Sequence, residues 1–276
     1  KYEKLNVGDI AYRDYTGHVM QEGVFATVEY ISQHWTAFLN GSFNITTDWR
    51  EDRFYYDEAH RLSEKVTFYG GTVKGGVNYI VNPNHNIFVN AGFISRAPKF
   101  TGAFMSATTS HMLNKDVKNE KIASVELGYG FHNEYVNLVF NGYYTRWIDK
   151  TMSYYTDLAT QETGFVNMNG VGAQHMGLEF ELKACPTKWL EINTMLSLGD
   201  WRWKGKEHGN PVNEQGTITE MASPEHTWAK INVENVQVGG QAQTTAALGL
   251  LFKPFKGFRI GGEYTLFDRN YSYYSF

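Results

Sequence analysis

One short stretch of the chain gathers carboxylates in a pattern that could hold a metal ion. The segment TDWREDRFYYDEAH, residues 47–60, carries five of them: Asp48, Glu51, Asp52, Asp57 and Glu58. Hard oxygen ligands of this kind suit calcium. Their spacing does not match an EF-hand loop, so the sequence favours a solvated acidic loop and predicts no metal site.

A second set of carboxylates recurs where apolar and polar residues alternate, and it comprises Glu126, Glu179, Glu181, Glu191 and Glu263. Pairs of such groups could serve glycoside hydrolysis, but side chains at every second position more simply line the wet side of a sheet. We likewise interpret His175 as a polar residue on the wet side of the sheet and not as a metal ligand. The motifs Gly-Lys-Ser, His-Glu-x-x-His and Gly-x-Ser-x-Gly are absent from the sequence. We therefore assign no catalytic residue and no cofactor, and the sequence predicts a protein that is not an enzyme.

Aromatic residues in the polar connections are the better candidates for ligand contact. They are Trp49, Tyr55, Tyr56, Tyr154, Tyr155, Trp201 and Trp203. Flat aromatic faces suit stacking against glycans and planar chelates. The alternative, which has at least equal weight, is that these rings pack the connections against one another.

The elements that must position these residues are strands. Leu178 and Phe180 alternate with Glu179 and Glu181, and this period of two indicates a sheet with one apolar face. The same alternation predicts about ten strands, at residues 24–31, 34–44, 72–81, 86–95, 122–131, 135–145, 175–184, 189–203, 245–253 and 258–266.

Short and long connections alternate strictly between these strands. Five are tight turns, near residues 32–33, 82–85, 132–133, 185–188 and 254–257. Four are long, at roughly residues 46–71, 96–119, 147–169 and 203–241. Strands joined by a tight turn are antiparallel. Every tight turn therefore falls on one edge of the sheet, and every long connection falls on the other.

Two architectures fit this pattern, a soluble β-sandwich with a buried apolar face and a transmembrane barrel whose apolar face meets lipid. Strands of about 10 residues match a membrane span better than the usual globular strand of about 5–6. The asymmetry of the connections is typical of outer-membrane barrels, and aromatic residues such as Trp35, Trp147 and Trp189 recur near strand ends like interface girdles. The sequence therefore predicts an all-β, antiparallel transmembrane barrel with Leu178 facing lipid and Glu179 facing water.

Composition excludes several other classes. The chain has 276 residues and a formal net charge of -4, so no basic field points to nucleic acid. A single cysteine, Cys185, excludes an intramolecular disulfide. No stretch approaches the roughly 20 apolar residues of a membrane helix. The 18 Tyr, 18 Phe and 7 Trp residues make a β-rich profile.

The segment NIFVNAGFISRAPKFTGAF, residues 86–104, is an Asn-Ala-Gly strand that runs into Ser-Arg-Ala-Pro and an aromatic residue. It resembles a stretch of the barrels of TonB-dependent outer-membrane receptors of the Bacteroidetes type. FYGGTVKGGVNYIVNPNHNIFVN, GVGAQHMGLEFEL, VQVGGQAQTTAALGL and EYTLFDRNYSYYSF are similar to the same family, in the same order. The resemblance covers most of the chain and does not identify a ligand.

The resemblance implies an energised nutrient importer in the bacterial outer membrane. Its barrel would have about 22 strands closed by an N-terminal plug. The ligand, a glycan, metal chelate or similar small molecule, would bind the extracellular loops and the plug. The implied partners are outer-membrane lipid, the TonB energy-transducing complex and a possible surface lipoprotein.

The sequence departs from the family pattern at both ends. The plug and the TonB-contacting segment have no counterpart in residues 1–276, and FDRN, residues 267–270, reads as the start of another long loop. We therefore expect residues 1–276 to form part of one barrel domain, about ten strands from its C-terminal part. Its first and last strands should not pair with each other.

Two other functions stay open at this point. One is an outer-membrane enzyme on a small barrel of about ten strands, which would require the first strand to close directly onto the last. The other is a soluble carbohydrate-binding β-sandwich.

Overall fold

The computed structural model describes residues 4–11, 13–106, 108–209, 211–213, 217–218 and 229–273. The strands are β1 (Tyr15–Ile31), β2 (Trp35–Asp52), β3 (Val66–Asn82), β4 (His85–Arg96), β5 (Glu120–His132), β6 (Val136–Asp157), β7 (Thr163–Thr187), β8 (Leu190–Lys204), β9 (Lys206–Gly209), β10 (Pro211–Val212), β11 (Ala229–Asn232), β12 (Ala242–Phe252) and β13 (Ile260–Asn270). One short helix, α1 (Phe100–Ala103), lies in the connection between β4 and β5. In the part of the chain that is described, no helix is long and apolar enough to cross a membrane.

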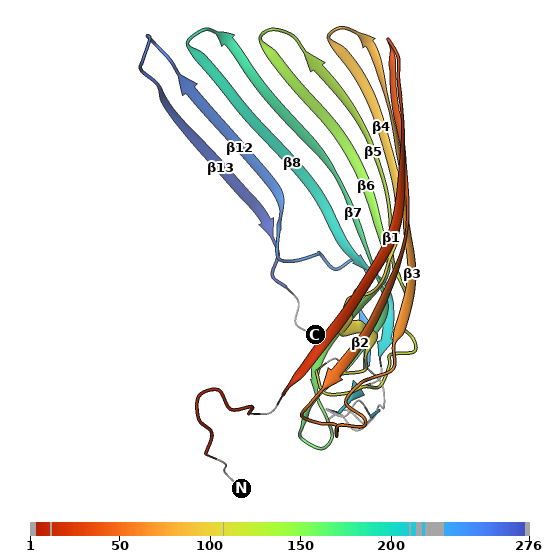
Figure 1. Cartoon of the computed structure of the whole chain (residues 1–276). Helices are drawn as coiled ribbons and strands as arrows, with labels where there is room; N and C mark the ends of the chain where they lie inside the picture. Colours follow the sequence, from red (N-terminus) through yellow and green to blue (C-terminus); the bar gives the residue numbers. More distant parts are fainter. Residues whose placement is uncertain are drawn as a thin grey trace.

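The long strands form one antiparallel sheet in the order β1 to β8, then β12 and β13, with β10 paired to β7. Strands β9 and β11 pair separately in the connection between β8 and β12. The sheet curves into a trough with the tight turns at one end and the long connections at the other (Figure 1). The ten predicted strands correspond to the ten of the main path, so the predicted all-β antiparallel fold is confirmed. The β-sandwich alternative is wrong, because these strands form one sheet and not two packed layers.

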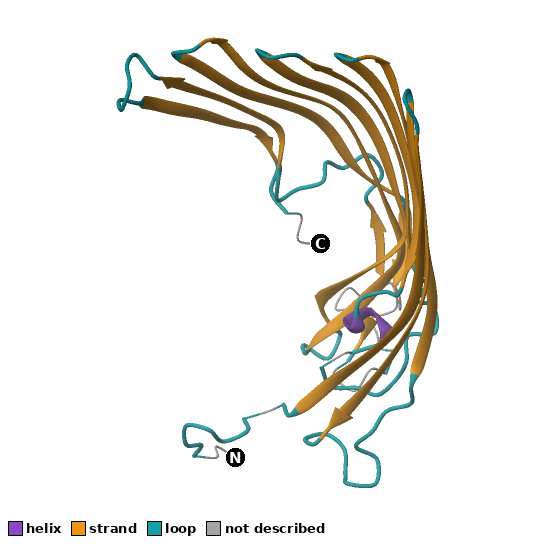
Figure 2. Ribbon diagram, turned by 45° about the horizontal axis from the view of Figure 1, so that its top comes forward, coloured by secondary structure: helices purple, strands orange, loops and turns teal. Residues whose placement is uncertain are grey.

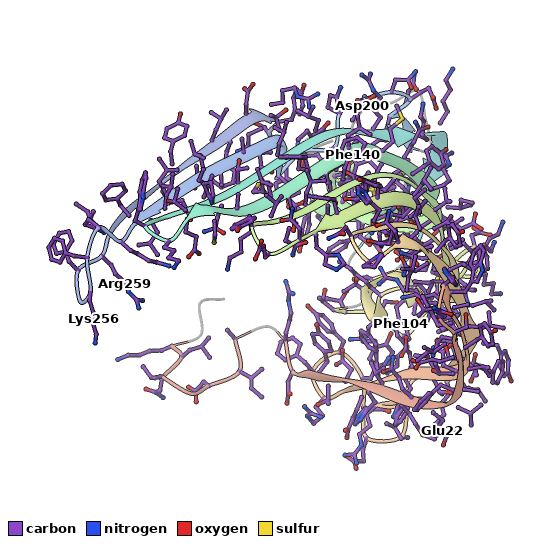
Figure 3. All side chains as sticks on the ribbon, turned by 90° about the horizontal axis from the view of Figure 1, so that it is seen from above. Glu22, Phe104, Phe140, Asp200, Lys256 and Arg259 are labelled. Atoms are coloured by element: carbon purple, nitrogen blue, oxygen red, sulfur yellow. The ribbon has the colours of Figure 1, made fainter. Side chains whose placement is uncertain are left out.

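The apolar residues lie on the convex face of this sheet. Arg50 of β2 contacts Phe104, which stands on the concave side (Figure 3). Leu39 and Phe43, an odd number of residues away on the same strand, therefore point to the convex side. Val28, Leu39, Val73 and Leu127 are each more than half exposed. Exposed apolar side chains over a whole face are what a lipid-facing barrel wall requires.

Aromatic pairs stand at the tight-turn end of the sheet. The rings of Trp35 and Tyr79 lie 4.4 Å apart, and those of Trp189 and Phe252 lie 5.1 Å apart. They agree with the predicted girdle on that side. Trp147 does not, because its ring is on the concave side, within cation–π distance of Arg96 and Lys150.

Two of the long connections, predicted at residues 46–71 and 147–169, are shorter than predicted, because the strands on either side run further. The predicted loop at residues 147–169 is wrong, since β6 and β7 continue as a hairpin to Asp157 and from Thr163. The register slips between Trp147 and Met152, where Asp149 takes a positive φ of 58°. Each slip shifts the alternation by one residue, which hides the strands from a period-two reading. The first two strands likewise extend the sheet, with β1 beginning at Tyr15 and β2 ending at Asp52.

The predicted loop start at residues 267–270 is also wrong. Asp268 pairs with Thr244 and Asn270 with Ala242, so this segment is the end of β13. Among the residues that the structure describes, β1 pairs only with β2, and β13 only with β12. The prediction that the first and last strands do not pair with each other is confirmed. The direct closure that a small barrel enzyme would require is not observed.

Candidate ligand site on the concave face

The connection between β4 and β5, described at residues 97–106 and 108–119, folds onto the concave face of the sheet at its loop end (Figure 2). Ala103 and Phe104 are fully buried there and form a cluster with Phe68 of β3. The ring of Phe100 lies directly over Gly17 of β1, where a Cβ atom would come within 2.9 Å of it. Glycine at this position allows the inward loop to lie flat against the wall.

Arg50 anchors this loop electrostatically. Its side chain is fully buried, and Nη2 donates to Oδ2 of Asp52 at 2.8 Å. The guanidinium lies 5.0 Å from the ring centre of Tyr15 and 6.0 Å from that of Phe104. Oδ1 of Asp52 accepts the backbone N–H of Tyr55 at 2.8 Å. The ion pair therefore joins β1, β2, the start of the 53–65 connection and the inward loop.

His111 of the inward loop completes this junction. Its ring stacks on Tyr56 and its backbone N–H donates to the Tyr56 hydroxyl at 2.9 Å. Nδ1 lies 3.4 Å from Nη1 of Arg50, and Nε2 lies 3.1 Å from the carbonyl oxygen of His60. Burial lowers the pKa of His111, and the charge of Arg50 lowers it further. The neutral ring then accepts from Arg50 at Nδ1 and donates to His60 from Nε2.

The carboxylates of residues 47–60 do not form one solvated loop. Asp48 and Asp52 lie on β2 and are buried, which contradicts that interpretation for both. The others have basic partners: Glu51 contacts Arg53 and Arg61, Asp57 contacts His60, and Glu58 contacts Arg61. No group of three or more His, Cys, Asp or Glu residues suited to a metal ion is found in the described part of the chain.

Asparagine side chains attach the inward loop to the β6–β7 hairpin. Nδ2 of Asn167 donates to the carbonyl oxygens of Phe104 and Met105, at 3.0 and 3.2 Å. Asn114 and Asn169 are 3.3 Å apart through their side-chain amides. Asn167 and Asn114 are almost fully buried. Such contacts hold the loop across the trough, because unpaired carbonyl and amide groups are costly once buried.

A cavity of about 550 Å³ lies between this loop and the hairpin. Its lining residues include Asn114, Asn167 and Asn169 and the charged Lys118 and Asp149, and the Asp149 carboxylate is paired with Lys121. The cavity is thus bordered by amide-bearing residues and by residues of both positive and negative charge. The cavity can therefore take a small polar ligand that carries several hydrogen-bonding groups.

Nearer the tight turns, the concave face carries a chain of polar side chains. Asn90 donates to Glu126, and Asn141 donates to both Glu126 and Glu179, at 3.2, 2.9 and 3.1 Å. Glu191 pairs with Lys253 at 2.8 Å. These glutamates line the wet side of the sheet through shared hydrogen bonds with amides and an ammonium group. Their geometry is that of a polar wall.

The seven aromatic residues predicted to touch ligand are not gathered in one place. Tyr154 and Trp203 pack around a buried cluster made of Val166, Met168, Val171 and Val233. Trp201 donates to the Tyr143 hydroxyl at 2.9 Å, on the concave wall. Tyr155 is exposed and its ring lies 4.7 Å from that of Phe165.

The remaining three lie around the 53–65 connection. Tyr56 is stacked on His111, and Tyr55 meets Phe54 edge to face. Trp49 belongs to β2, and alternation puts it on the convex side, where it stacks on His18 at 4.9 Å. Only Tyr55 and Tyr56 are in a connection, since the other five lie within strands. Their contact with ligand stays a prediction.

Several residues of the site were not foreseen from the sequence, namely Arg50, His111, Asn114, Asn167 and Asn169. Each acts through a partner that is distant along the chain, as Asn167 does with Phe104. No sequence motif marks any of the five, and their roles come from these contacts with distant segments.

Comparison with known proteins agrees with this architecture. Residues 4–275 match the family TonB dependent receptor-like, beta-barrel. A search of curated protein sequences finds no match. Among solved structures, the copper transporter OprC shares the fold over 90% of this chain, with a TM-score of 0.54 and 11% identity. The chain spans 42% of that transporter's length.

Two structures of variants of the ferric enterobactin receptor PfeA from Pseudomonas aeruginosa are also similar, each at 9% identity over 90% of this chain and 48% of theirs. Their TM-scores of 0.30 and 0.28 are too low to carry an argument about fold.

The family match extends over nearly the whole chain and accounts for the curved antiparallel sheet, its apolar convex face and the asymmetry of its connections. Barrels of this family lie in the outer membrane of Gram-negative bacteria, and that is the location of this protein. The chain belongs to the TonB-dependent receptor-like β-barrel family.

Proposed function

We propose that this chain forms part of the wall of an energised outer-membrane transporter of the Bacteroidetes type, which takes up a nutrient with the help of the TonB complex. The observation that carries the proposal is the inward loop, residues 97–119, which is docked on the concave face through Asn167 and Arg50. A loop fixed inside a polar trough is placed to receive a ligand before it passes along the wall.

The barrel is proposed to contain further strands beside β1 and β13. In lipid, each unpaired backbone group of an edge strand costs several kcal/mol. Both strands have one neighbour among the described residues, so partners on their open sides would remove a large penalty. A closed barrel of about 22 strands has a lumen wide enough to need a plug. We propose that a plug and a TonB-contacting segment lie outside this sheet.

The ligand is proposed to be a glycan, a metal chelate or a similar small molecule. The cavity between the inward loop and the β6–β7 hairpin offers amide, carboxylate and ammonium groups to it. Exposed rings such as Tyr155 would add stacking surfaces. A surface lipoprotein that covers the long connections is a further proposed partner.

The experiment is a comparison of two deletion strains, one without this protein and one without TonB. Both are grown on a panel of oligosaccharides, ferric siderophores and metal salts at limiting concentration. We expect one nutrient class to be lost from both strains, and complementation with the full-length gene to restore it. Growth of the strain without this protein that equals wild type on every nutrient lost without TonB would contradict the proposal.

A loop variant refines the test. Asn167→Ala in the complementing gene removes the donor to the loop carbonyls. We expect it to weaken uptake of the same nutrient, whereas Asn137→Ala, on the wall far from the loop, leaves uptake at the wild-type rate.

A further inference from the structure

Arg269 has an unusual backbone conformation for a residue inside a strand. Its φ is 52°, in the left-handed region, although Asp268 and Asn270 on either side are paired with β12. A long side chain is rarely held at such an angle, and where it is, the strain often serves a site. The conformation turns the side chain back along β12. There, Nε donates to Oγ1 of Thr244 at 2.7 Å and Nη2 donates to the carbonyl oxygen of Gln243 at 3.1 Å.

Strand alternation alone would direct the Arg269 side chain to the concave face, opposite to the face of its neighbour Asp268. Thr244 lies opposite Leu198 in the ladder between β12 and β8, and Leu198 belongs to the apolar convex face. The hydrogen bond to Thr244 therefore holds the guanidinium on the convex, lipid-facing side of the sheet.

An apolar groove of about 710 Å³ lies beside this guanidinium on the convex face. Gly142 forms its floor, because Gly142 stands between Leu127 and Leu178 in the ladders of β5, β6 and β7 and has no side chain. Tyr144 and Leu198 are among its other apolar residues. One end of the groove is polar and is formed by Asp200 and Arg269.

At this polar end the Arg269 guanidinium has no carboxylate partner among the described residues, although the neighbouring Asp268 carboxylate accepts the backbone N–H of Arg269 at 2.8 Å. Both oxygens of Asp200 are contacted by Nε of Arg202, at 2.8 and 3.1 Å, so this carboxylate is neutralised by its own partner. The two acceptors of Arg269 are neutral oxygens, a hydroxyl and a carbonyl. A guanidinium has five N–H donors, and these two bonds fix its orientation while leaving donors for a phosphate.

The polar end also lies at the depth of a membrane interface. Asp200 is ten residues beyond Leu190, where β8 begins at the tight-turn end. A strand crosses the hydrocarbon in about 9–11 residues. Asp200 and Arg269 therefore stand at the interface on the side of the long connections, and the groove runs from them into the hydrocarbon region.

We propose that this groove binds one phosphorylated glycolipid of the outer leaflet, with an acyl chain over Gly142 and a phosphate on Arg269. The proposal rests on the orientation used for the proposed function, in which the long connections face outward. An apolar groove that ends at an arginine matches both parts of such a lipid, because the guanidinium fork fits the geometry of a phosphate.

The test uses the full-length protein purified in detergent, and binding is measured by native mass spectrometry. The probes are lipid A with its phosphates, the same lipid A after enzymatic removal of phosphate, and phosphatidylglycerol. Arg269→Gly removes the guanidinium and suits the positive φ, so this variant should fold, which heat-dependent gel mobility will verify. Gly142→Leu fills the groove floor. Lys256→Ala, in the tight turn at the opposite end, is the control (Figure 3).

We expect the intact protein to bind phosphorylated lipid A about tenfold more tightly than the Arg269→Gly variant does. Removal of phosphate should weaken binding to the intact protein by a similar factor and should not change binding to that variant. Gly142→Leu should weaken both lipid A forms, and Lys256→Ala should weaken neither.

Equal affinity of the intact protein and Arg269→Gly for phosphorylated lipid A would overturn the proposal, as would tighter binding of phosphatidylglycerol than of lipid A. The measurement needs neither TonB nor a nutrient, so it separates this proposal from the proposed function. Lipid selectivity without TonB-dependent uptake would reject only the latter.

Discussion

His111 stacks on Tyr56 with ring centroids 3.8 Å apart and an interplanar angle of 18°. The two residues belong to different long connections, so this contact joins the 53–65 segment to the inward loop. Arg50 stands beside them and is held by Asp52. The loop end of the trough is thus one unit in which two connections and two strands share a buried ion pair.

Docking of the inward loop should depend on pH through His111. Burial and the charge of Arg50 both lower the pKa of His111, so the docked state favours the neutral ring. The stabilisation of the docked loop is complete above the undocked pKa of about 6.5. It is lost as pH falls below that value and through the lowered docked pKa. We expect amide hydrogen exchange in residues 104–113, corrected for intrinsic rates, to speed up between pH 7.5 and pH 5.

The matched variant is His111→Asn, which cannot acquire charge in this range. Exchange in the same segment should then be faster than in the parent at pH 7.5 and should lose most of its dependence on pH. An unchanged pH dependence in His111→Asn would show that another group controls the loop.

Asn167→Ala should release the inward loop while leaving the barrel wall intact. The change removes the donor to the carbonyl oxygens of Phe104 and Met105. A buried acceptor without a partner costs about 1–3 kcal/mol. We expect faster cleavage of residues 104–118 by an added protease, with no change in the heat-dependent gel mobility of the barrel. Asn137→Ala is the control, and equal cleavage of the two variants would contradict the role given to Asn167.

The two faces of β7 should respond very differently to substitution. Leu178→Arg, or Leu248→Arg on β12, places a charge in hydrocarbon and should cost about 2–4 kcal/mol. Glu179→Gln keeps an acceptor for Asn141 on the wet side and should cost less than about 1 kcal/mol. Folding titrations of the full-length protein in lipid vesicles measure both. Equal losses would mean that the convex face is buried in protein and not in lipid.

The strands could be predicted from the sequence because lipid and water impose opposite demands on alternate residues. Leu178 and Glu179 carry that signal by themselves, and so do their counterparts in the other strands of the main path. The prediction failed where alternation is interrupted. The bulge around Asp149 hid the outer half of the β6–β7 hairpin, and the polar Asp268 and Asn270, which pair with β12, made the end of β13 resemble a loop.

The candidate site was much less predictable. The aromatic residues were chosen for their chemistry, and the structure distributes them among a packed cluster, both faces of the sheet and one connection. Trp49 stacks on His18 because β2 extends to Asp52, which the acidic composition of that segment obscured. The contacts that dock the inward loop, such as Asn167 with Phe104, join distant segments and leave no local pattern.

The last prediction concerns which end of the sheet faces the cell exterior. Short turns lie on the periplasmic side of outer-membrane barrels and long loops outside. Cys185 is first replaced by serine, and single cysteines are then introduced at Glu58 in the 53–65 connection or at Lys256 in the β12–β13 turn. A maleimide too large to cross the membrane should label position 58 in intact cells and position 256 only after permeabilisation. Labelling of position 256 but not of 58 in intact cells would reverse the orientation, and with it the leaflet assigned to Arg269.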